Sequence, residues 1–207
     1  MSDAVTEHVR GPVGMILTGG QGTRIGGGKA LMPFAGGTLL DAVIARVREQ
    51  VRVLALNVTV KTAGAFAVYG AGHPLVPDDL PEGTGPLAGV VAGLDWLAAT
   101  GGAPWLATFP CDTPFLPRDL VAQLMAGART APVAARANGR LQGVCTVWPL
   151  RCRAQLRDGV ENGALRSLHG AIDALGGTSV DVVCDMEAFF NVNTPDDLAR
   201  AGEMARL

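Results

Sequence analysis

A glycine-rich stretch from Thr18 to Lys29 constrains this chain more than any other feature of its sequence. The stretch holds six glycines in twelve residues and directly follows an apolar run, Val13 to Leu17. Glycine loses more backbone entropy on folding than any other residue, so such a segment indicates that bare backbone must approach something closely. Backbone N–H groups and a lysine are well suited to hold a polyphosphate. The stretch therefore predicts a phosphate-binding loop after a buried strand.

Two well-known phosphate motifs do not fit this loop. The dinucleotide fingerprint G-x-G-x-x-G fails because, counted from Gly20, its sixth position is Ile25. The P-loop G-x-x-x-x-G-K-[ST] fails because, counted back from Gly28-Lys29, its first glycine would be Thr23, and the lysine is followed by Ala30. The loop is therefore expected to bind phosphate by another arrangement.

Composition excludes several classes of function. The 207 residues carry 17 Lys and Arg against 19 Asp and Glu, with no basic block, so a nucleic-acid surface is not indicated. No apolar run approaches the ~18–20 residues of a membrane span, and the polar N-terminus is unlike a secretory signal. We therefore expect a cytoplasmic protein without membrane contact. The spacing of the four cysteines and three histidines favours buried free thiols over a metal or redox site.

The order of apolar and amphipathic segments predicts an α/β fold. Strand and helix patterns alternate over the first 127 residues, with strands expected at 13–17, 51–58, 75–76 and 105–109 and helices at 39–50, 63–69, 86–99 and 117–127. Such alternation is typical of a mostly parallel twisted sheet with helices on both faces. We expect a single domain over residues 1–207, with 1–11 as a flexible N-terminal extension.

The second half adds antiparallel elements to this expected sheet. Asn138-Gly139 lies between apolar runs at 132–136 and 141–148 and is a hairpin signal. Helices are expected at 149–157 and 163–175, and a strand at 180–183. Thr194 is expected to cap the last helix, with Pro195 at its first position and acidic residues in its first turn.

Four motifs together carry a resemblance to a known family. Residues 17–29 fit L-x-G-G-x-x-x-R-x-G-x-x-K, which resembles the nucleotidyltransferases that activate sugars or pterins with a nucleoside triphosphate. Three further segments narrow the resemblance: D-x6-G-P-L-A-G at 78–89, P-C-D-T-P at 110–114 and F-N-V-N-T-P at 190–195. Together they are similar to the molybdenum cofactor guanylyltransferases, which join GMP to molybdopterin, over residues 15 to about 198. The resemblance implies a Rossmann-like nucleotidyltransferase fold.

Three positions in the first motif depart from the usual family sequence. Thr18 stands where the family usually has Ala, and Ile25 where it usually has Met. Gly28 replaces an Asp before the lysine, which removes one carboxylate beside Lys29. The long methylene stem of Lys29 can still deliver its charge to a phosphate.

The resemblance gives the motif residues expected roles. Arg24 and Lys29 would neutralise phosphate charge, which increases on the leaving pyrophosphate. Asp112 follows a wholly apolar strand and offers carboxylate oxygens suited to Mg²⁺, the expected cofactor. Asp78 is preferred over Asp79 because it keeps the family's spacing to Gly85. The expected catalytic residues are Lys29, Arg24 and Asp112, the nucleotide-binding residues are Leu17, Thr18, Gly19, Gly20, Gly22, Lys29, Asn57, Asp78 and Asp112, and the pterin-binding residues are Asn191 and Asn193.

Each of these roles has a structural alternative. Asn57 and Asn193 also fit turn positions, Asp78 fits an Asx turn, and Asp112 fits a helix cap. At the level of function, the alternatives are a cytidylyltransferase acting on the same pterin, a sugar-phosphate nucleotidyltransferase, or a non-catalytic protein that binds and delivers molybdopterin. The resemblance implies GTP and molybdopterin as substrates, and transient contacts with other cofactor-biosynthesis proteins or acceptor apoenzymes.

Overall fold

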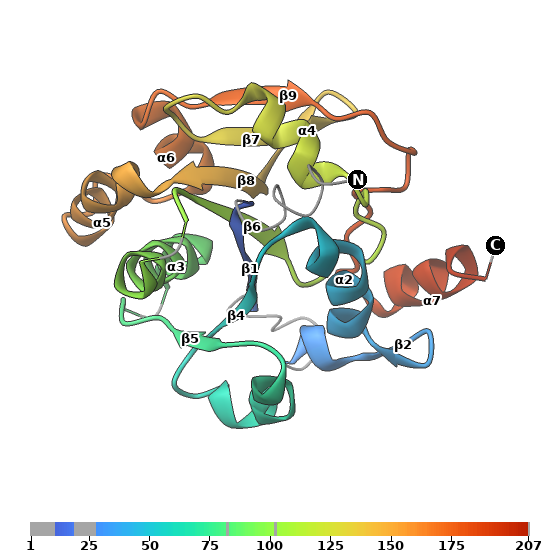
Figure 1. The fold of residues 1–207 in the computed structure, drawn as a ribbon. Coiled ribbons are helices and arrows are strands. Elements are labelled where there is room, and N and C mark those ends of the chain that lie inside the picture. The colour runs from blue at the N-terminus through green and yellow to red at the C-terminus, as the bar shows by residue number, and fades with distance from the viewer. Residues whose placement is uncertain (1–10, 19–27, 82, 102, 207) are drawn as a thin grey trace, which may run out of the picture.

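The computed structural model describes residues 11–18, 28–81, 83–101 and 103–206. Its centre is a seven-stranded sheet in which the first strand of the chain is an interior strand (Figure 1). In spatial order the strands are β5 (Leu75–Pro77), β4 (Leu54–Val58), β1 (Val13–Leu17), β6 (Trp105–Pro110), β8 (Arg140–Pro149), β7 (Val133–Ala137) and β9 (Thr178–Asp181).

Strand directions confirm the predicted α/β fold. β1 pairs in parallel with β4 and β6, and β4 pairs in parallel with β5. β8 runs antiparallel to both β6 and β7, whereas β7 and β9 are parallel. The hairpin between β7 and β8 turns at Asn138 and Gly139, whose φ angles of 50° and 71° are those of a two-residue turn with both central residues in the left-handed region.

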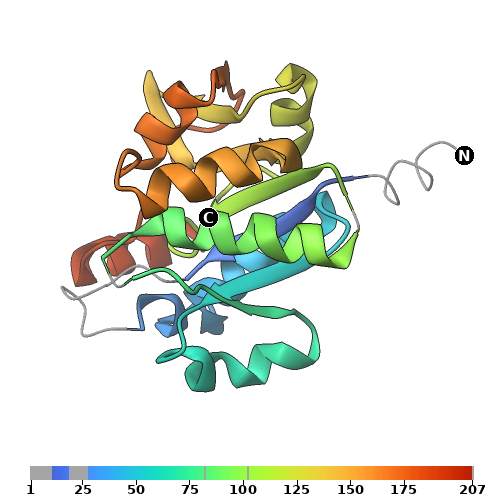
Figure 2. The same cartoon turned by 90° about the vertical axis from the view of Figure 1, so that its left-hand side faces the viewer.

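Helices cover both faces of the sheet, and each face has its own core. α2 (Leu39–Val47) and α4 (Leu120–Gly127) bury their apolar residues against one face. α3 (Pro86–Thr100), α5 (Arg153–Glu161) and α6 (Leu168–Ala174) bury theirs against the other. Figure 2 shows α3 and α5 side by side on that second face.

A third, smaller cluster joins the C-terminal segment to the start of the chain. The short antiparallel pair β2 (Pro33–Phe34) and β3 (Gly37–Thr38) precedes α2, and α7 (Pro195–Met204) packs beside it. Phe34, Leu39, Val192 and Ala201 are the buried members of this cluster. It therefore fixes the segment that leads into α7 close to the region around Lys29.

Several element boundaries differ from the predicted ones. The helix expected from Pro117 begins at Leu120, after a turn in which Leu120 N–H donates to the Pro117 carbonyl. The helix expected from Gly163 begins at Leu168, because Gly163 has a φ of 75° and Ser167 provides the N-cap by accepting from Gly170 N–H. β8 extends to Pro149, so α5 starts only at Arg153, after a 3-10 turn.

Three smaller corrections concern β4, β9 and the helix expected near residue 63. β4 begins at Leu54 rather than at residue 51, and β9 covers 178–181 rather than 180–183. Residues 63–71 form 3-10 helix. Across the described ranges, no helix is both long and apolar enough to cross a membrane. The predicted N-terminal extension lies outside the described residues except for Gly11 and stays a prediction.

Candidate active site

The carboxyl ends of four parallel strands meet at one edge of the sheet, where open α/β sheets bind their ligands. Leu17 at the end of β1 is in register with Asn57 of β4 and with Pro110 of β6, and Asn57 is in register with Val76 of β5. Asp112 and Asp78 directly follow β6 and β5. The sequence-predicted residues at 17, 18, 57, 78 and 112 therefore lie along this one edge.

On one side of the edge, three polar residues from distant parts of the chain meet. Lys29 Nζ lies 2.6 Å from Asp112 Oδ2 and donates to Asn193 Oδ1 at 2.7 Å. The exposed fractions of the Lys29 and Asp112 side chains are 13% and 21%. We call this group, together with Thr113 and Asn191, the β6 side of the site. Its Lys29–Asp112 ion pair leaves both charges partly accessible to a ligand.

Asp112 is supported by the segment before α7. Its carbonyl accepts from Val192 N–H at 2.9 Å, which ties the end of β6 to residues 191–193. The hydroxyl of Thr113, only 1% exposed, donates to Asn191 Oδ1 and lies 3.3 Å from Asp112 Oδ1. Sequence reasoning gave no role to Thr113. A hydroxyl residue directly after a strand-ending aspartate is the signal that could have found it.

The N-terminus of α7 fixes Asn193, as the sequence predicted for the cap. Thr194 Oγ1 accepts from Asp197 N–H, and Asp197 Oδ2 accepts from the N–H groups of Asn193 and Thr194 at 2.9 and 2.8 Å. The bond from Asn193 N–H, followed by that from Thr194, lowers the pKa of the Asp197 carboxyl because both stabilise its charged form. This capping box holds Asn193 beside Lys29.

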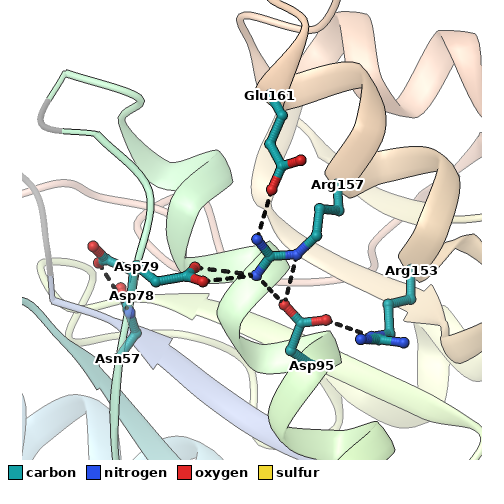
Figure 3. Close-up of polar contacts among 7 residues, drawn as sticks. All are labelled: Asn57, Asp78, Asp79, Asp95, Arg153, Arg157 and Glu161. Carbon is teal, nitrogen blue, oxygen red and sulfur yellow. Dashed lines mark hydrogen bonds and ion pairs between the residues drawn. The ribbon is translucent and has the colours of Figure 1, made fainter.

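On the other side of the edge, Asn57 is buried and connects β4 to Asp78. It is 2% exposed, and its Nδ2 donates to the Val76 carbonyl at 3.2 Å and to Asp78 Oδ2 at 3.3 Å (Figure 3). Its backbone carbonyl accepts from the Thr18 hydroxyl. Both amide hydrogens of Asn57 are therefore engaged within the protein, and Asn57 holds Asp78 in place.

Close packing of α3 keeps Asn57 in this position. A Cβ added at Gly89 would lie 2.5 Å from Asn57 Oδ1 and 2.8 Å from Leu17 Cδ2. Real Cβ atoms do not come this close to other atoms, so only glycine allows α3 to approach the ends of β1 and β4 here. Gly89, the second glycine of the predicted G-P-L-A-G motif, thus has a packing role. We call Asn57, Asp78 and Asp79 the β5 side of the site.

Backbone geometry explains the departure at residue 28. Gly28 has a φ of 82° and a ψ of 24°, in the left-handed region that favours glycine, and it immediately precedes the 3-10 turn Lys29–Leu31. No atom lies within 4 Å of where its Cβ would be, so the reason for glycine is the backbone conformation and not lack of space. The predicted phosphate-loop residues Gly19, Gly20, Gly22 and Arg24 lie outside the described residues.

The ionisable groups near Asp112 include an inert thiol. Burial, followed by the negative charge of Asp112, raises the pKa of the Cys111 thiol to about 12, so it stays protonated at neutral pH. In the part of the chain that the structure describes, no group of three or more His, Cys, Asp or Glu could hold a metal ion.

Comparison with known proteins identifies relatives over most of the chain. A family profile described as a MobA-like NTP transferase domain matches residues 14–177. The chain is 36% identical over 199 residues to a protein of Mesorhizobium japonicum named molybdenum cofactor guanylyltransferase. That match covers 92% of this chain and 94% of the relative.

Solved structures share the fold. The molybdopterin-guanine dinucleotide biosynthesis protein A of Archaeoglobus fulgidus superposes with a TM-score of 0.77 at 20% identity, covering 94% of this chain and 98% of that one. A Mycobacterium tuberculosis protein, solved in complex with manganese, superposes with a TM-score of 0.63 at 19% identity, covering 94% and 99%. At these identities the likeness is one of fold.

Proposed function

The chain belongs to the family of MobA-like NTP transferase domains, and from that premise we propose that it is a molybdenum cofactor guanylyltransferase. In this role it transfers GMP from GTP to molybdopterin and releases pyrophosphate. The relative that it matches over 92% of its length carries this name. The observation that carries the proposal is the Lys29–Asp112 contact of 2.6 Å at the carboxyl edge of the sheet. A cation and a carboxylate side by side suit the binding of a nucleotide's phosphates and of the metal ion that accompanies them.

The reaction asks the protein mainly for positioning and charge. A terminal phosphate oxygen of molybdopterin attacks the α-phosphorus of GTP and forms a new P–O bond. The bond from the α-phosphorus to the oxygen that bridges to the β-phosphorus breaks, and pyrophosphate leaves with the electron pair. The attacking oxygen is already anionic, so no general base is needed. Lys29 stabilises the charge that increases on the leaving group, from a side chain only 13% exposed.

Asp112 fits the role of a Mg²⁺ ligand. Mg²⁺ takes oxygen ligands and is usually bound by one or two protein carboxylates together with substrate phosphates and waters. Asp112 supplies one carboxylate, 21% exposed, at the end of β6. When bound, Mg²⁺ would neutralise phosphate oxygens. Thr113, next to Oδ1, and Lys29, on Oδ2, orient the carboxylate for that role.

The nucleoside is assigned to the β5 side. Asp78 offers its carboxylate there, and Leu17 and Thr18 offer backbone groups at the end of β1. Asn57 acts through Asp78, because its amide hydrogens are already bonded to Asp78 and to the Val76 carbonyl. The glycines at 19, 20 and 22 and Arg24 complete the proposed phosphate loop and stay predictions from the sequence.

The pterin is assigned to the segment before α7. Asn193 contacts Lys29, and Asn191 contacts Thr113, so this segment borders the proposed phosphate site. Molybdopterin approaching from here would bring its phosphate toward Lys29. Transient contact with other cofactor-biosynthesis proteins or acceptor apoenzymes remains part of the proposal.

A nucleotide-specificity assay tests the function. The full chain is incubated with molybdopterin, Mg²⁺ and either GTP or CTP, and pyrophosphate release is followed together with the mass of the pterin product. We expect pyrophosphate and a guanine dinucleotide product with GTP. Preferential turnover of CTP would instead make the protein a cytidylyltransferase. GTP and molybdopterin binding without pyrophosphate release would make it a binding or delivery protein.

A further inference from the structure

Arg157, on α5, contacts Asp79 of the β5 side of the site. Arg157 Nη2 lies 3.1 and 3.3 Å from the two carboxylate oxygens of Asp79, and its Nε donates to Asp95 Oδ2 at 3.0 Å (Figure 3). Its Nη1 donates to Glu161 Oε1 at 2.7 Å. The Arg157 side chain is 25% exposed. The hydrogen bonds that Arg157 donates to Asp95, Glu161 and Asp79, in that order, raise its pKa, so its charge is permanent.

Asp78 and Asp79 are held from opposite directions. Figure 3 shows the Asp78 carboxylate pointing toward Asn57 and the Asp79 carboxylate pointing toward Arg157. The backbone of this pair is also anchored to the sheet, because Asp78 N–H donates to the Val58 carbonyl at 3.1 Å. Arg157 therefore completes a clamp on the residue pair that precedes the loop.

Arg157 also joins the two ends of the segment made up of residues 78–81 and 83–85. Asp79 lies at its beginning, and α3 starts directly after its end, with Pro86 as the first helical residue. Asp95 lies further along the same helix. By binding Asp79 and Asp95 together, Arg157 connects the entry of the segment to the helix at its exit. Before α3 begins, Gly83 and Gly85 have φ angles of 95° and 70°, a conformation that favours glycine.

We propose that Arg157 is a positioning residue that, through its contact with Asp79, fixes the neighbouring Asp78 in the geometry that binds the nucleotide. This inference rests on the proposed function, because it assigns the nucleoside to Asp78. Arg157 contacts Asp79, the chain neighbour of Asp78, and does not itself contact the proposed nucleoside. Its loss would therefore weaken the binding of GTP. Its loss leaves Lys29 and Asp112 untouched, so it has little effect on the chemical step.

Arg153 provides a matched control on the same helix. It binds the other oxygen of the same partner, Asp95 Oδ1. Arg153 forms an ion pair with Asp95, whereas Arg157 forms ion pairs with both Asp95 and Asp79. Arg153→Gln thus removes one arginine from Asp95 and leaves the Asp79 contact in place. After Arg157→Gln, Arg153 still pairs with Asp95, so the Asp95 carboxylate keeps a partner of opposite charge.

Steady-state kinetics of the full chain test the inference. We expect Arg157→Gln to raise KM for GTP about fivefold to tenfold, while kcat stays within about twofold. Without Arg157, part of the binding free energy of GTP is used to order Asp78 and Asp79. Arg157→Lys, which keeps the charge but loses the planar fork, should recover only part of the loss. Asp79→Asn should raise KM for GTP like Arg157→Gln, and the double variant should be no worse than either. Arg153→Gln should leave KM for GTP within about twofold of wild type.

Hydrogen exchange gives a readout that does not depend on turnover. In Arg157→Gln we expect faster amide exchange than in Arg153→Gln at Asp79, Leu80, Gly83 and Thr84. Equal exchange at these residues, or an unchanged KM for GTP in Arg157→Gln, would overturn the inference. Failure of the proposed function is distinguishable, because the wild-type protein would then form no guanine dinucleotide product while the exchange comparison could still be made.

Discussion

On the β6 side of the site, Lys29 and Asp112 contact each other directly, whereas on the β5 side Asp78 is held by Asn57 and, through its neighbour Asp79, by Arg157. In the proposed function, the charges of Lys29 and Asp112 would act directly on the phosphates. On the β5 side, the Asp78 carboxylate proposed to bind the nucleoside is held by Asn57, and its neighbour Asp79 is held by Arg157. Under the proposed function, Lys29 and Asp112 would take part in the chemical step, whereas Asp78 would bind the nucleoside from a position that other residues fix. We therefore expect substitution of Lys29 or Asp112 to lower kcat, and substitutions on the β5 side to raise KM for GTP.

The largest expected effect comes from Asp112. Asp112→Ala removes the proposed metal ligand and the partner of Lys29, so we expect kcat to fall by about 10²–10³-fold or more, measured as pyrophosphate release with GTP and molybdopterin. Circular dichroism should show the wild-type fold. The matched control is Asp119→Ala, an exposed aspartate seven residues further on whose side chain makes no cap hydrogen bond, and it should keep wild-type turnover. Near-wild-type turnover in Asp112→Ala would show that Asp112 has no catalytic role and would contradict the proposed difference between the two sides.

The second effect concerns the packing behind Asn57. Gly89→Ala would place a Cβ 2.5 Å from Asn57 Oδ1, so Asn57 must shift and release Asp78. We expect a loss of about 1–3 kcal/mol in the free energy of unfolding, measured by urea denaturation. KM for GTP should rise about tenfold, more than kcat changes, since about 1.4 kcal/mol of affinity is tenfold.

A second glycine in a helix provides the control for this substitution. Gly202 lies in α7, and no atom lies within 4 Å of where its Cβ would be. Gly202→Ala should leave KM for GTP unchanged and stabilise the protein by about 0.5–1 kcal/mol, because alanine loses less backbone entropy in a helix. If both alanine variants gave the same KM, the close approach of α3 would have no bearing on nucleotide binding.

Substitution of Thr113 tests whether Asn191 serves the binding of the pterin or that of the nucleotide. Thr113→Val keeps a similar shape but removes the hydroxyl that donates to Asn191, so we expect a loss of about 1–2 kcal/mol in unfolding free energy. KM for molybdopterin should rise about threefold with KM for GTP unchanged, since under 1 kcal/mol of affinity is lost. Thr113→Ser keeps the hydroxyl and should retain the wild-type KM for molybdopterin. A rise in KM for GTP alone would contradict the assignment of Asn191 to the pterin.

The sequence predicted those parts of the molecule that depend on local pattern. Alternating apolar segments predicted the parallel sheet, and Asn138-Gly139 predicted the hairpin, because turn chemistry is local. The motifs predicted that Lys29 and Asp112 belong together, and the structure places them 2.6 Å apart. Their chemical roles stay predictions.

Contacts between distant residues could not be predicted in the same way. Arg157 is 78 residues from Asp79 and belongs to none of the motifs. The burial of Asn57 depends on α3 packing against β4, which no pattern near residue 57 encodes. The predicted start of a helix at Pro117 was wrong because proline at a first turn is a preference, and here the turn before Leu120 delays the helix.

The smallest expected effect concerns the capping box that holds Asn193 on the β6 side. The lowered pKa of Asp197 means that its carboxylate stabilises the folded protein at pH values above the unfolded-state pKa of about 4, and that this contribution disappears as the pH falls through the lower folded-state pKa. Thermal melting of wild type and Asp197→Asn from pH 7 to pH 2.5 should therefore show a constant difference above about pH 5 that shrinks below pH 4. A difference that grew with acid would mean that the Asn193 and Thr194 N–H groups do not bind the charged carboxylate. The capping box would then no longer account for the position of Asn193 beside Lys29.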